Sequence, residues 1–484
     1  MFQRVVALAF LTACTAGETD VAPPQFNFYY PTAVKVSPSE KHLFVLSANS
    51  DLRYSTGTLA TLDLDAVDAL ATTWLGGTNP GEGCTPTDRP QVIQCPTTDD
   101  NNAARGIILP RGTVKVGNFG VDIGVQRLFD GEQPTTKLRI FTTIRGDPSI
   151  TWIDFDETDG EMDCGPVGDA YPRCSPEHRL TRLRGDANLP AIPPEPFYIY
   201  VDGDRENVLT PHLTSGAVTL ADAPRQVGST PLIHDVNQNF WAPVGALGLV
   251  GAVGIAARTP GTPDGLIYVS SRQEARVAVL RIASGQDQPV GLSCAASDCP
   301  AAYTCDPGDH LCHKTDGRPW KALSQVTSFF LDGIPGGGFG ADARALAFSA
   351  DGSRLYMVSR TPAALKVFDT TLDDTGEPRN ALLGVMDICD QPATLELADF
   401  GRGPRIVIPC FGNGQVWTID PIALTIESTE DVGRGPTSVS VSPSRKRIYV
   451  ANYAEDTIGV IDATPGARTE ARMVLRIGVP RPTE

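Results

Sequence analysis

Few side chains in this sequence occur at spacings that support a catalytic reaction. The six histidines never form the His-Glu-x-x-His pattern that places two zinc ligands on one helix face. No Gly-x-Ser-x-Gly segment offers the exposed nucleophile of an α/β-hydrolase, and the glycine-rich segment 336–340 is not followed by the Lys-Ser/Thr pair of a phosphate loop. The sequence therefore predicts no catalytic residue, no metal ligand and no cofactor.

Aspartate recurs regularly at the ends of segments that alternate apolar and polar residues. A carboxylate at such a position accepts hydrogen bonds from the amides of the following turn, so the recurrence indicates a structural role and not an acid–base cluster. The recurring residues are Asp65, Asp156, Asp222, Asp369, Asp420 and Asp462. Segment 202–207 alternates oxygen-bearing side chains like a calcium loop, but it lacks the later bidentate glutamate, and we expect a solvated turn.

The N-terminus predicts export and lipidation. Val5–Ala13 is a short apolar run behind one positive charge, which is typical of a signal peptide and too short to span a bilayer. The following Cys14 completes a segment, Leu-Thr-Ala-Cys, that resembles the bacterial lipobox; a plain signal peptide is the alternative. We expect residues 1–13 to be removed and residues 14–30 to form a lipidated tether. Thr15 favours, by the same resemblance, a place in the bacterial outer membrane.

The remaining cysteines predict disulfides, because they are even in number and the protein is expected to be exported. Three local bridges follow from the spacing: Cys84 with Cys95, Cys164 with Cys174, and Cys389 with Cys410. A fourth group forms a small module at about 290–316 and consists of Cys294, Cys299, Cys305 and Cys312. Three pairings are possible there, of which Cys294–Cys305 with Cys299–Cys312 is favoured. A zinc knuckle that includes His310 or His313 is the alternative; the uneven spacing favours disulfides.

Composition limits the class of protein and of partner. The chain has 484 residues, of which 41% are hydrophobic, and this is enough for a globular core. Aspartate and glutamate number 57 against 40 lysines and arginines, so the formal net charge is −17. Nucleic-acid binding needs basic side chains to neutralise phosphates, and no basic block is present. We therefore expect no nucleic-acid partner.

Internal repetition predicts the architecture. Val34–Val45, Leu346–Met357 and Val439–Val450 share an alternating strand, a tight turn and a second apolar strand, and a third strand follows each. Weaker copies of the second and third strands lie at Leu138–Asp156, Asn207–Asp222, Leu266–Ile282 and Arg405–Asp420. Seven copies at roughly 40–45 residues each predict an all-β, seven-bladed β-propeller over residues 31–484, built of four-stranded antiparallel blades with disulfide-stapled loop insertions.

Two further features fit this architecture. Ala242–Ala257 is apolar but too short and too rich in glycine for a membrane helix, so we expect it to be the inner strand of the fourth blade with its lead-in. His212 and His234 lie where a side chain could face the central channel. Histidines satisfied by neighbouring loop atoms are the favoured interpretation.

The best-preserved repeat resembles a known family. Tyr449-Val450-Ala451-Asn452, followed by Thr457–Asp462, resembles the YVTN/YncE-like β-propeller repeat, in which a Tyr-Val-x-Asn strand leads to a Val-x-Val-Ile-Asp strand. The match is sharp over 436–463, fair over 31–65 and 342–370, and weak elsewhere. The resemblance implies an exported propeller with a binding or scaffold role more than a reaction.

Two function classes follow from these observations. The leading hypothesis is a non-catalytic, membrane-anchored binding or scaffold module for a protein, peptide or glycan. The alternative is an exported propeller enzyme, a lactonase-like hydrolase or a quinoprotein-like oxidoreductase, with its site at the mouth of the channel. Arg344 and Arg434 precede or begin inner strands and are flanked by small residues. Exposed at the mouth, both could bind an anion there. Pairing of both arginines with the excess of acidic side chains on the surface is the alternative, and it is the favoured interpretation.

Overall fold

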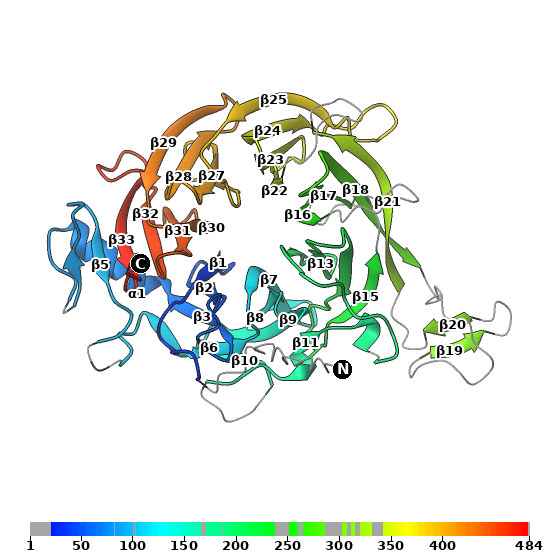
Figure 1. Ribbon diagram of the computed structural model, residues 1–484, viewed down its shortest axis with the longest axis horizontal. Helices are drawn as coiled ribbons and strands as arrows, with labels where there is room; N and C mark the ends of the chain where they lie inside the picture. Colours follow the sequence, from blue (N-terminus) through cyan, green and yellow to red (C-terminus); the bar gives the residue numbers. More distant parts are fainter. Residues whose placement is uncertain are drawn as a thin grey trace, which may run out of the picture.

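Seven antiparallel sheets, counted over the described part of the chain, stand around one axis (Figure 1). The computed structural model describes residues 21–81, 83–99, 101, 103–165, 171–185, 187–237, 251–259, 265–285, 303–306, 311–314, 320–331 and 342–482. The prediction of an all-β, seven-bladed propeller is confirmed.

The first three blades follow one another along the chain, each with its inner strand first. The first contains β1 (Pro31–Val36), β2 (His42–Ser47), β3 (Gly57–Asp63) and β6 (Ile108–Val116). The second contains β7 (Gly120–Asp130), β8 (Gln133–Ile144), β9 (Ser149–Asp156) and β10 (Glu161–Asp163), and β11 (Arg179–Leu180) also pairs with β9. The third contains β12 (Tyr200–Asp202), β13 (Asn207–Pro211), β14 (Val218–Asp222) and β15 (Leu232–Asn237).

The last four blades keep the same order. The fourth contains β16 (Ala252–Ala257), β17 (Leu266–Ser271), β18 (Arg276–Gly285) and β21 (Trp320–Phe330). The fifth contains β22 (Ala343–Phe348), β23 (Arg354–Arg360), β24 (Ala363–Asp369) and β25 (Ala381–Asp387). The sixth contains β26 (Glu396–Asp399), β27 (Pro404–Cys410), β28 (Gln415–Asp420) and β29 (Thr425–Asp431), and the seventh β30 (Pro436–Ser442), β31 (Arg447–Asn452), β32 (Thr457–Asp462) and β33 (Arg472–Ile477).

Burial explains why the middle strands carry the recognisable repeats. Every residue of β2, β17 and β31 is buried, because these strands are packed by neighbouring blades on both faces. They are therefore rich in apolar residues. The outermost strand β25 has no buried residue, so its sequence is less constrained. The three clearest copies span the first and second strands of a blade, with the third strand following, and the four weaker copies coincide with second and third strands. The inner strand expected within Ala242–Ala257 is β16; residues 242–250 lie outside the described residues.

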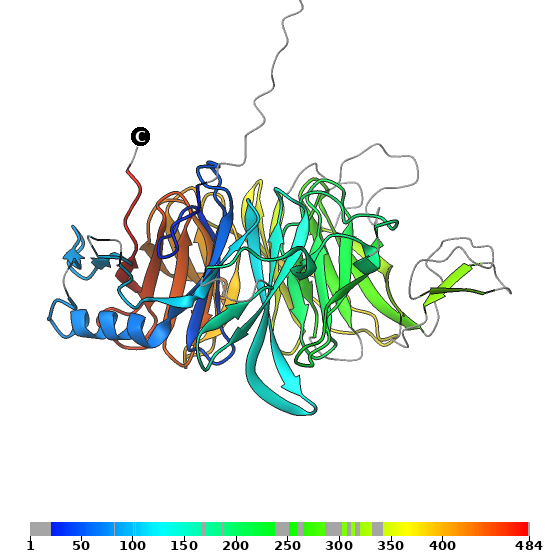
Figure 2. The same cartoon turned by 90° about the horizontal axis from the view of Figure 1, so that it is seen from below.

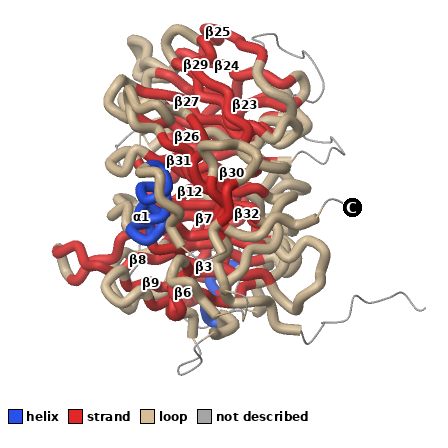
Figure 3. The backbone as a smooth tube through the Cα atoms, turned by 90° about the vertical axis from the view of Figure 1, so that its left-hand side faces the viewer, coloured by secondary structure: helices blue, strands red, loops and turns tan. Residues whose placement is uncertain are grey.

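The segment after β3 departs from the sequence-based expectation. A helix, α1 (Leu64–Leu75), begins where the third strand was expected to run on to Asp65. Asp63 caps it by accepting hydrogen bonds from the amides of Asp65 and Ala66. Figure 3 shows α1 on the outside of the disc. Two shorter 3₁₀ turns occupy Pro176–His178 and Leu183–Gly185.

The ring closes between the first and seventh blades through side chains and through an inserted hairpin. The amides of Val34 and Val36 in β1 donate to the hydroxyls of Ser438 and Ser440 in β30, at 3.3 and 3.0 Å. On the outside, β5 (Ile93–Cys95) pairs in parallel with the edge of β33. The strand β5 belongs to the insertion after α1, where it also pairs with β4 (Thr85–Pro86). The insertion of the first blade thus covers the outer edge of the last.

Two hairpins extend beyond the disc. The β7–β8 ribbon projects from one face, whereas the C-terminal segment leaves the opposite face (Figure 2). The β19–β20 hairpin (Tyr303–Asp306 and Leu311–Lys314) lies outside the ring (Figure 1) and belongs to the cysteine-rich insertion.

Candidate functional site

A cavity of about 410 Å³ opens at the end of the channel where the inner strands begin. Its walls come from the lead-ins and first residues of β1, β7, β12, β22, β26 and β30, together with the loops that follow the second strands. The lining residues include Thr32, Gly120, Tyr198, Arg344, Thr394 and Thr437. Its volume lies within the roughly 300–1,000 Å³ of small-molecule sites in proteins.

Three guanidinium groups line this mouth: those of Arg145, Arg344 and Arg360. Arg344 is 7% exposed, and its Nη2 donates to Oδ2 of Asp342 at 3.0 Å. The Nε of Arg360 donates to the carbonyl oxygen of Pro392 at 2.9 Å. Burial lowers the pKa of Arg360, and the nearby charge of Arg344 acts in the same direction.

An aromatic ring fixes two of these arginines. The guanidinium carbons of Arg145 and Arg344 lie 5.8 and 5.9 Å from the ring centroid of Phe197. Each arginine also has a carboxylate partner, Glu195 for Arg145 and Asp342 for Arg344. The cation–π contacts and ion pairs limit the freedom of the guanidinium groups, so little conformational entropy remains to be lost when an anion binds.

Asp122, on β7, is the acidic side chain of the mouth. Burial raises its pKa to about 6, although the amides of Ile199 and Ile123 donate to it at 3.0 and 2.9 Å and oppose the shift. Deeper in the channel, Lys35 of β1 and Glu396 of β26 form an ion pair at 3.5 Å across a smaller space of about 200 Å³ that Asp122 also lines. A carboxyl group with such a pKa can exchange a proton near neutral pH.

Tyr198 spans the channel. Its hydroxyl donates to the carbonyl oxygen of Ala393 at 3.0 Å, which joins the lead-ins of the third and sixth blades. Burial raises the pKa of Tyr198 to about 12. The phenol therefore stays protonated at physiological pH and acts as a hydrogen-bond donor that holds the two blades together.

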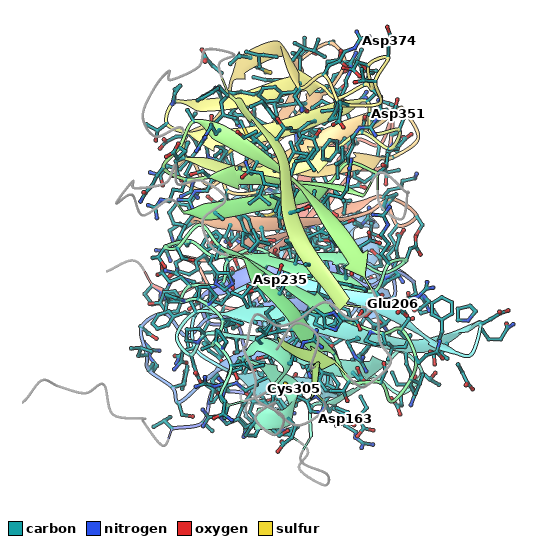
Figure 4. The ribbon with its side chains drawn as sticks, turned by 90° about the vertical axis from the view of Figure 1, so that its right-hand side faces the viewer. Asp163, Glu206, Asp235, Cys305, Asp351 and Asp374 are labelled. Atoms are coloured by element: carbon teal, nitrogen blue, oxygen red, sulfur yellow. A yellow bond between two sulfur atoms is a disulfide. The ribbon has the colours of Figure 1, made fainter. Side chains whose placement is uncertain are left out.

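The mouth contrasts electrically with the rest of the protein. The chain carries a net charge of −17, and acidic side chains such as Asp351 and Asp374 lie on outer loops (Figure 4). Three arginines nevertheless converge on one cavity, where Glu195 and Asp342 offset the charges of two of them and Arg360 donates to the carbonyl oxygen of Pro392. Positive groups in a concave site attract small anions more strongly than the same groups on a flat surface do.

The structure places the two predicted ligand-binding arginines differently. Arg344 lines the mouth, but it is buried, whereas the sequence suggested an exposed side chain. Arg434 lies outside the lining of this cavity; its guanidinium donates to the carbonyl oxygen of Arg481, and its own amide donates to Glu455. The two guanidinium groups therefore do not share this cavity.

Most of the recurring aspartates serve the turns that follow them. The carboxylates of Asp156, Asp369, Asp420 and Asp462 accept hydrogen bonds from amides two residues along the chain. Two residues differ from this prediction. Asp65 lies in α1 and pairs with Arg445, and Asp222 accepts a hydrogen bond from Lys321 at 2.6 Å. Segment 202–207 forms a turn in which the amide of Arg205 donates to Asp202 at 3.2 Å.

The two candidate channel histidines are buried in the third blade. His212 is fully buried, with Nδ1 3.2 Å from the carbonyl oxygen of Pro194 and Nε2 2.7 Å from the hydroxyl of Thr219. His234 is fully buried as well, 3.9 Å from a carboxylate oxygen of Asp222. Neither lines the mouth.

The predicted local bridges Cys84–Cys95, Cys164–Cys174 and Cys389–Cys410 are present as disulfides. Cys305 is also disulfide-bonded, but the predicted pairings of its cluster lie outside the described residues, as does Cys14. Across the described ranges, no group of three or more His, Cys, Asp and Glu residues is placed to hold a metal ion. No helix in the same ranges has the length and apolarity needed to cross a membrane.

Sequence reasoning missed five charged residues of the channel: Lys35, Asp122, Arg145, Arg360 and Glu396. A weak signal was present for two of them, because a charged residue interrupts the apolar residues of the inner strand in PTAVKV and GVDIGV. Such a residue must face the channel, where water or a partner charge stabilises it. Glu396 begins the short strand ELAD, which also contains Asp399, and gave a less distinct signal. Arg145 directly follows the second strand β8 and Arg360 ends the second strand β23, and neither gave a comparable signal.

Known proteins share the fold but not the sequence. No protein-family model and no curated protein matches the chain. A candidate 6-phosphogluconolactonase from Bacteroides fragilis superposes with a TM-score of 0.50 at 13% identity, over 91% of this chain and 98% of that one. The periplasmic gluconolactonase of Pseudomonas aeruginosa gives 0.46 at 14% over 82% and 84%. The Cps50 propeller domain of Myceliophteria thermophila gives 0.47 at 9% over 90% and 97%. At these identities the likeness concerns the fold alone.

Proposed function

We propose that this propeller binds a small anionic, hydroxyl-bearing ligand, of the sugar-acid type, at the mouth of its channel. The observation that carries the proposal is the convergence of three arginines on one cavity of a protein with a net charge of −17. Threonine and serine side chains and several aromatic rings complete the walls. Guanidinium groups bind carboxylates, hydroxyls exchange hydrogen bonds with sugar hydroxyls, and aromatic faces stack on sugar rings.

The proposal includes a place in the cell envelope. Cys14 in its lipobox-like segment would anchor the protein to the outer membrane, and the YVTN/YncE-like repeats are those of an exported propeller. Three disulfides support export, because such bonds persist in oxidising compartments. The protein would therefore meet its ligand outside the cytoplasm.

Calorimetric titration with glucuronate and with glucose tests the binding function. Glucuronate should bind, and glucose, which lacks the carboxylate, should bind at least about tenfold more weakly, the loss expected for one charge-assisted hydrogen bond. Arg344→Gln should reduce glucuronate affinity by a similar factor. Arg402→Gln is the matched control, because the side chain of Arg402 is 55% exposed, pairs with Glu470 and lies outside the lining of the mouth. Equal affinities for the two sugars, or equal effects of the two variants, would refute the proposal.

Hydrolysis of a cyclic sugar ester at the same mouth is a second candidate, which Asp122 favours. Its raised pKa suits a general base: the carboxylate would take a proton from water as the water oxygen attacks the lactone carbonyl. The ring C–O bond then breaks, the leaving oxygen takes the proton from Asp122, and a hydroxy acid forms. The Bacteroides neighbour is described as a candidate 6-phosphogluconolactonase, which makes gluconolactone a sensible first substrate.

Lactone hydrolysis gives this second candidate a direct test. The rate should rise with pH through about 6 as Asp122 ionises, and Asp122→Asn should lower kcat/KM by about a hundredfold or more. An unchanged rate in Asp122→Asn would eliminate Asp122 as the base. Sugar-acid binding without any hydrolysis would leave the binding function standing and exclude the enzyme.

A further inference from the structure

A second cavity adjoins the mouth. It has a volume of about 290 Å³ and lies between the first and second blades, farther from the axis. Its basic lining residues are Lys115, Arg173 and Arg179, and its one carboxylate among the described residues is Asp147. Asp147 pairs with Arg179, so the charges of Lys115 and Arg173 give this cavity a positive excess.

The same three loops line both cavities. The loop after β2 contributes residues 48 and 50 to the mouth and residues 52, 54 and 55 to the second cavity. The connection from β6 to β7, with the adjoining ends of both strands, contributes residues 119–122 to the mouth and residues 115–119 to the second cavity. The turn after β8 provides Arg145 to one and Gly146 and Asp147 to the other. The two cavities are therefore neighbouring parts of one surface depression.

Phe119 is the residue that divides them, because it lines both. Its φ of 59° lies in the left-handed region that few non-glycine residues adopt. Its amide donates to the carbonyl oxygen of Ala48 at 2.8 Å, and its carbonyl oxygen accepts from the amide of Arg145 at 3.1 Å. These contacts fix the Phe119 backbone between the loops of both blades, at the point where the linings of the two cavities meet.

The disulfide loop of the second blade supplies a cation to the second cavity. The amide of Lys115 donates to the carbonyl oxygen of Pro172 at 2.8 Å, and the amide of Cys174 donates back to Lys115 at 3.0 Å. Arg173, which lies between Pro172 and Cys174 in sequence, is exposed and lines the cavity. The Cys164–Cys174 bridge closes this loop and so holds Arg173 beside Lys115.

Hydroxyl-bearing and aromatic side chains complete the walls of the second cavity. Ser55 and Thr151 both line it, although the Oγ1 atom of Thr151 is itself buried. Tyr54 adds an aromatic side chain to the same walls.

We propose that the two cavities are subsites for one extended ligand, an acidic oligosaccharide with one sugar in the mouth and the next in the second cavity, on either side of Phe119. This inference rests on the proposed function and specifies its ligand class. Each subsite offers cations for a carboxylate, an aromatic side chain and hydroxyl groups, so the pattern of recognition repeats from one subsite to the next. Such a repeat matches a polymer of uronic acid units.

Titration with galacturonate and digalacturonate tests the second subsite. The disaccharide should bind at least about tenfold more tightly than the monosaccharide, the gain of one charge-assisted contact. Arg173→Gln and Lys115→Gln should abolish this gain and leave the affinity of the mouth for the monosaccharide unchanged, because neither residue lines the mouth. Arg173 is exposed and lies on a loop, so its replacement leaves the blade core intact. The control variant Arg402→Gln should preserve both affinities.

The outcomes separate this inference from the proposed function. If galacturonate binds and Arg344→Gln weakens it, but the disaccharide gains nothing or Arg173→Gln leaves its gain intact, the second subsite is refuted and the mouth stands. If neither galacturonate nor glucuronate binds in the mouth, the proposed function itself fails. An acidic dipeptide, Glu-Glu, serves as the competing ligand: tighter binding of this peptide than of digalacturonate would overturn the carbohydrate assignment.

Discussion

Ring closure by the inserted hairpin allows a quantitative comparison of two disulfides. Cys84 and Cys95 are 11 residues apart and close the hairpin that carries β5. Cys164 and Cys174 are 10 residues apart and close a loop of the second blade. Because the loop lengths are nearly equal, loss of either bridge should remove about 3 kcal/mol from the free energy of unfolding by the chain-entropy argument.

Only one of the two bridges should affect the edge of the last blade. The amide of Gly478, directly after β33, donates to the carbonyl oxygen of Cys95 at 2.9 Å, so its hydrogen exchange reports whether β5 is docked. The Cys84–Cys95 bridge restrains the hairpin when it leaves β33. Without the bridge, the undocked hairpin has more conformational entropy, which lowers the free energy of undocking by the same amount, about 3 kcal/mol. The amide of Gly478 should therefore exchange about a hundredfold faster.

The assay is native-state hydrogen exchange together with urea unfolding of the double alanine variants. Both variants should fold, because the large propeller core does not depend on peripheral loops. Gly478 exchange should accelerate in Cys84→Ala/Cys95→Ala and remain near wild type in Cys164→Ala/Cys174→Ala. Equal Gly478 exchange in the two variants would show that β5 does not secure the ring. Failure of the second variant to fold would show that its bridge belongs to the blade core.

Three further predictions follow from single residues. Cys14→Ser should release the exported protein from membranes after a salt wash, because the acyl chains provide the anchor; retention would contradict lipidation. Burial lowers the pKa of His212 from 6.5 to about 4, so the unfolded chain takes up this proton first and the free energy of unfolding should fall by about 3 kcal/mol between pH 6.5 and 4. Urea unfolding at a series of pH values should show a smaller dependence of the free energy of unfolding on pH in His212→Gln. Glucuronate affinity should weaken as the pH rises through about 6, because ionised Asp122 repels the ligand, and calorimetry on Asp122→Asn should find no such change.

The sequence determined the number of blades and the identity of their central strands. An alternating apolar pattern, a tight turn and a second apolar run are local features, and residues such as those of β31 are buried on both faces wherever the blade lies in the ring. The pairing of three disulfides was equally local, because each closes a loop of at most 21 residues. The start of α1 was also encoded, in the cap residue Asp63, but the alternating residues before it concealed the change from strand to helix.

The site was decided by the tertiary structure. Lys35 and Glu396 form an ion pair only because the first and sixth blades both direct an inner strand toward the axis, and no local pattern relates residues so far apart in sequence. The pKa of Asp122 depends on burial by neighbouring blades. The pairing of β5 with β33 joins residues from the first and last blades. Repetition specifies each blade from nearby residues, whereas the chemistry of the mouth arises from single positions of different blades that only ring closure brings together.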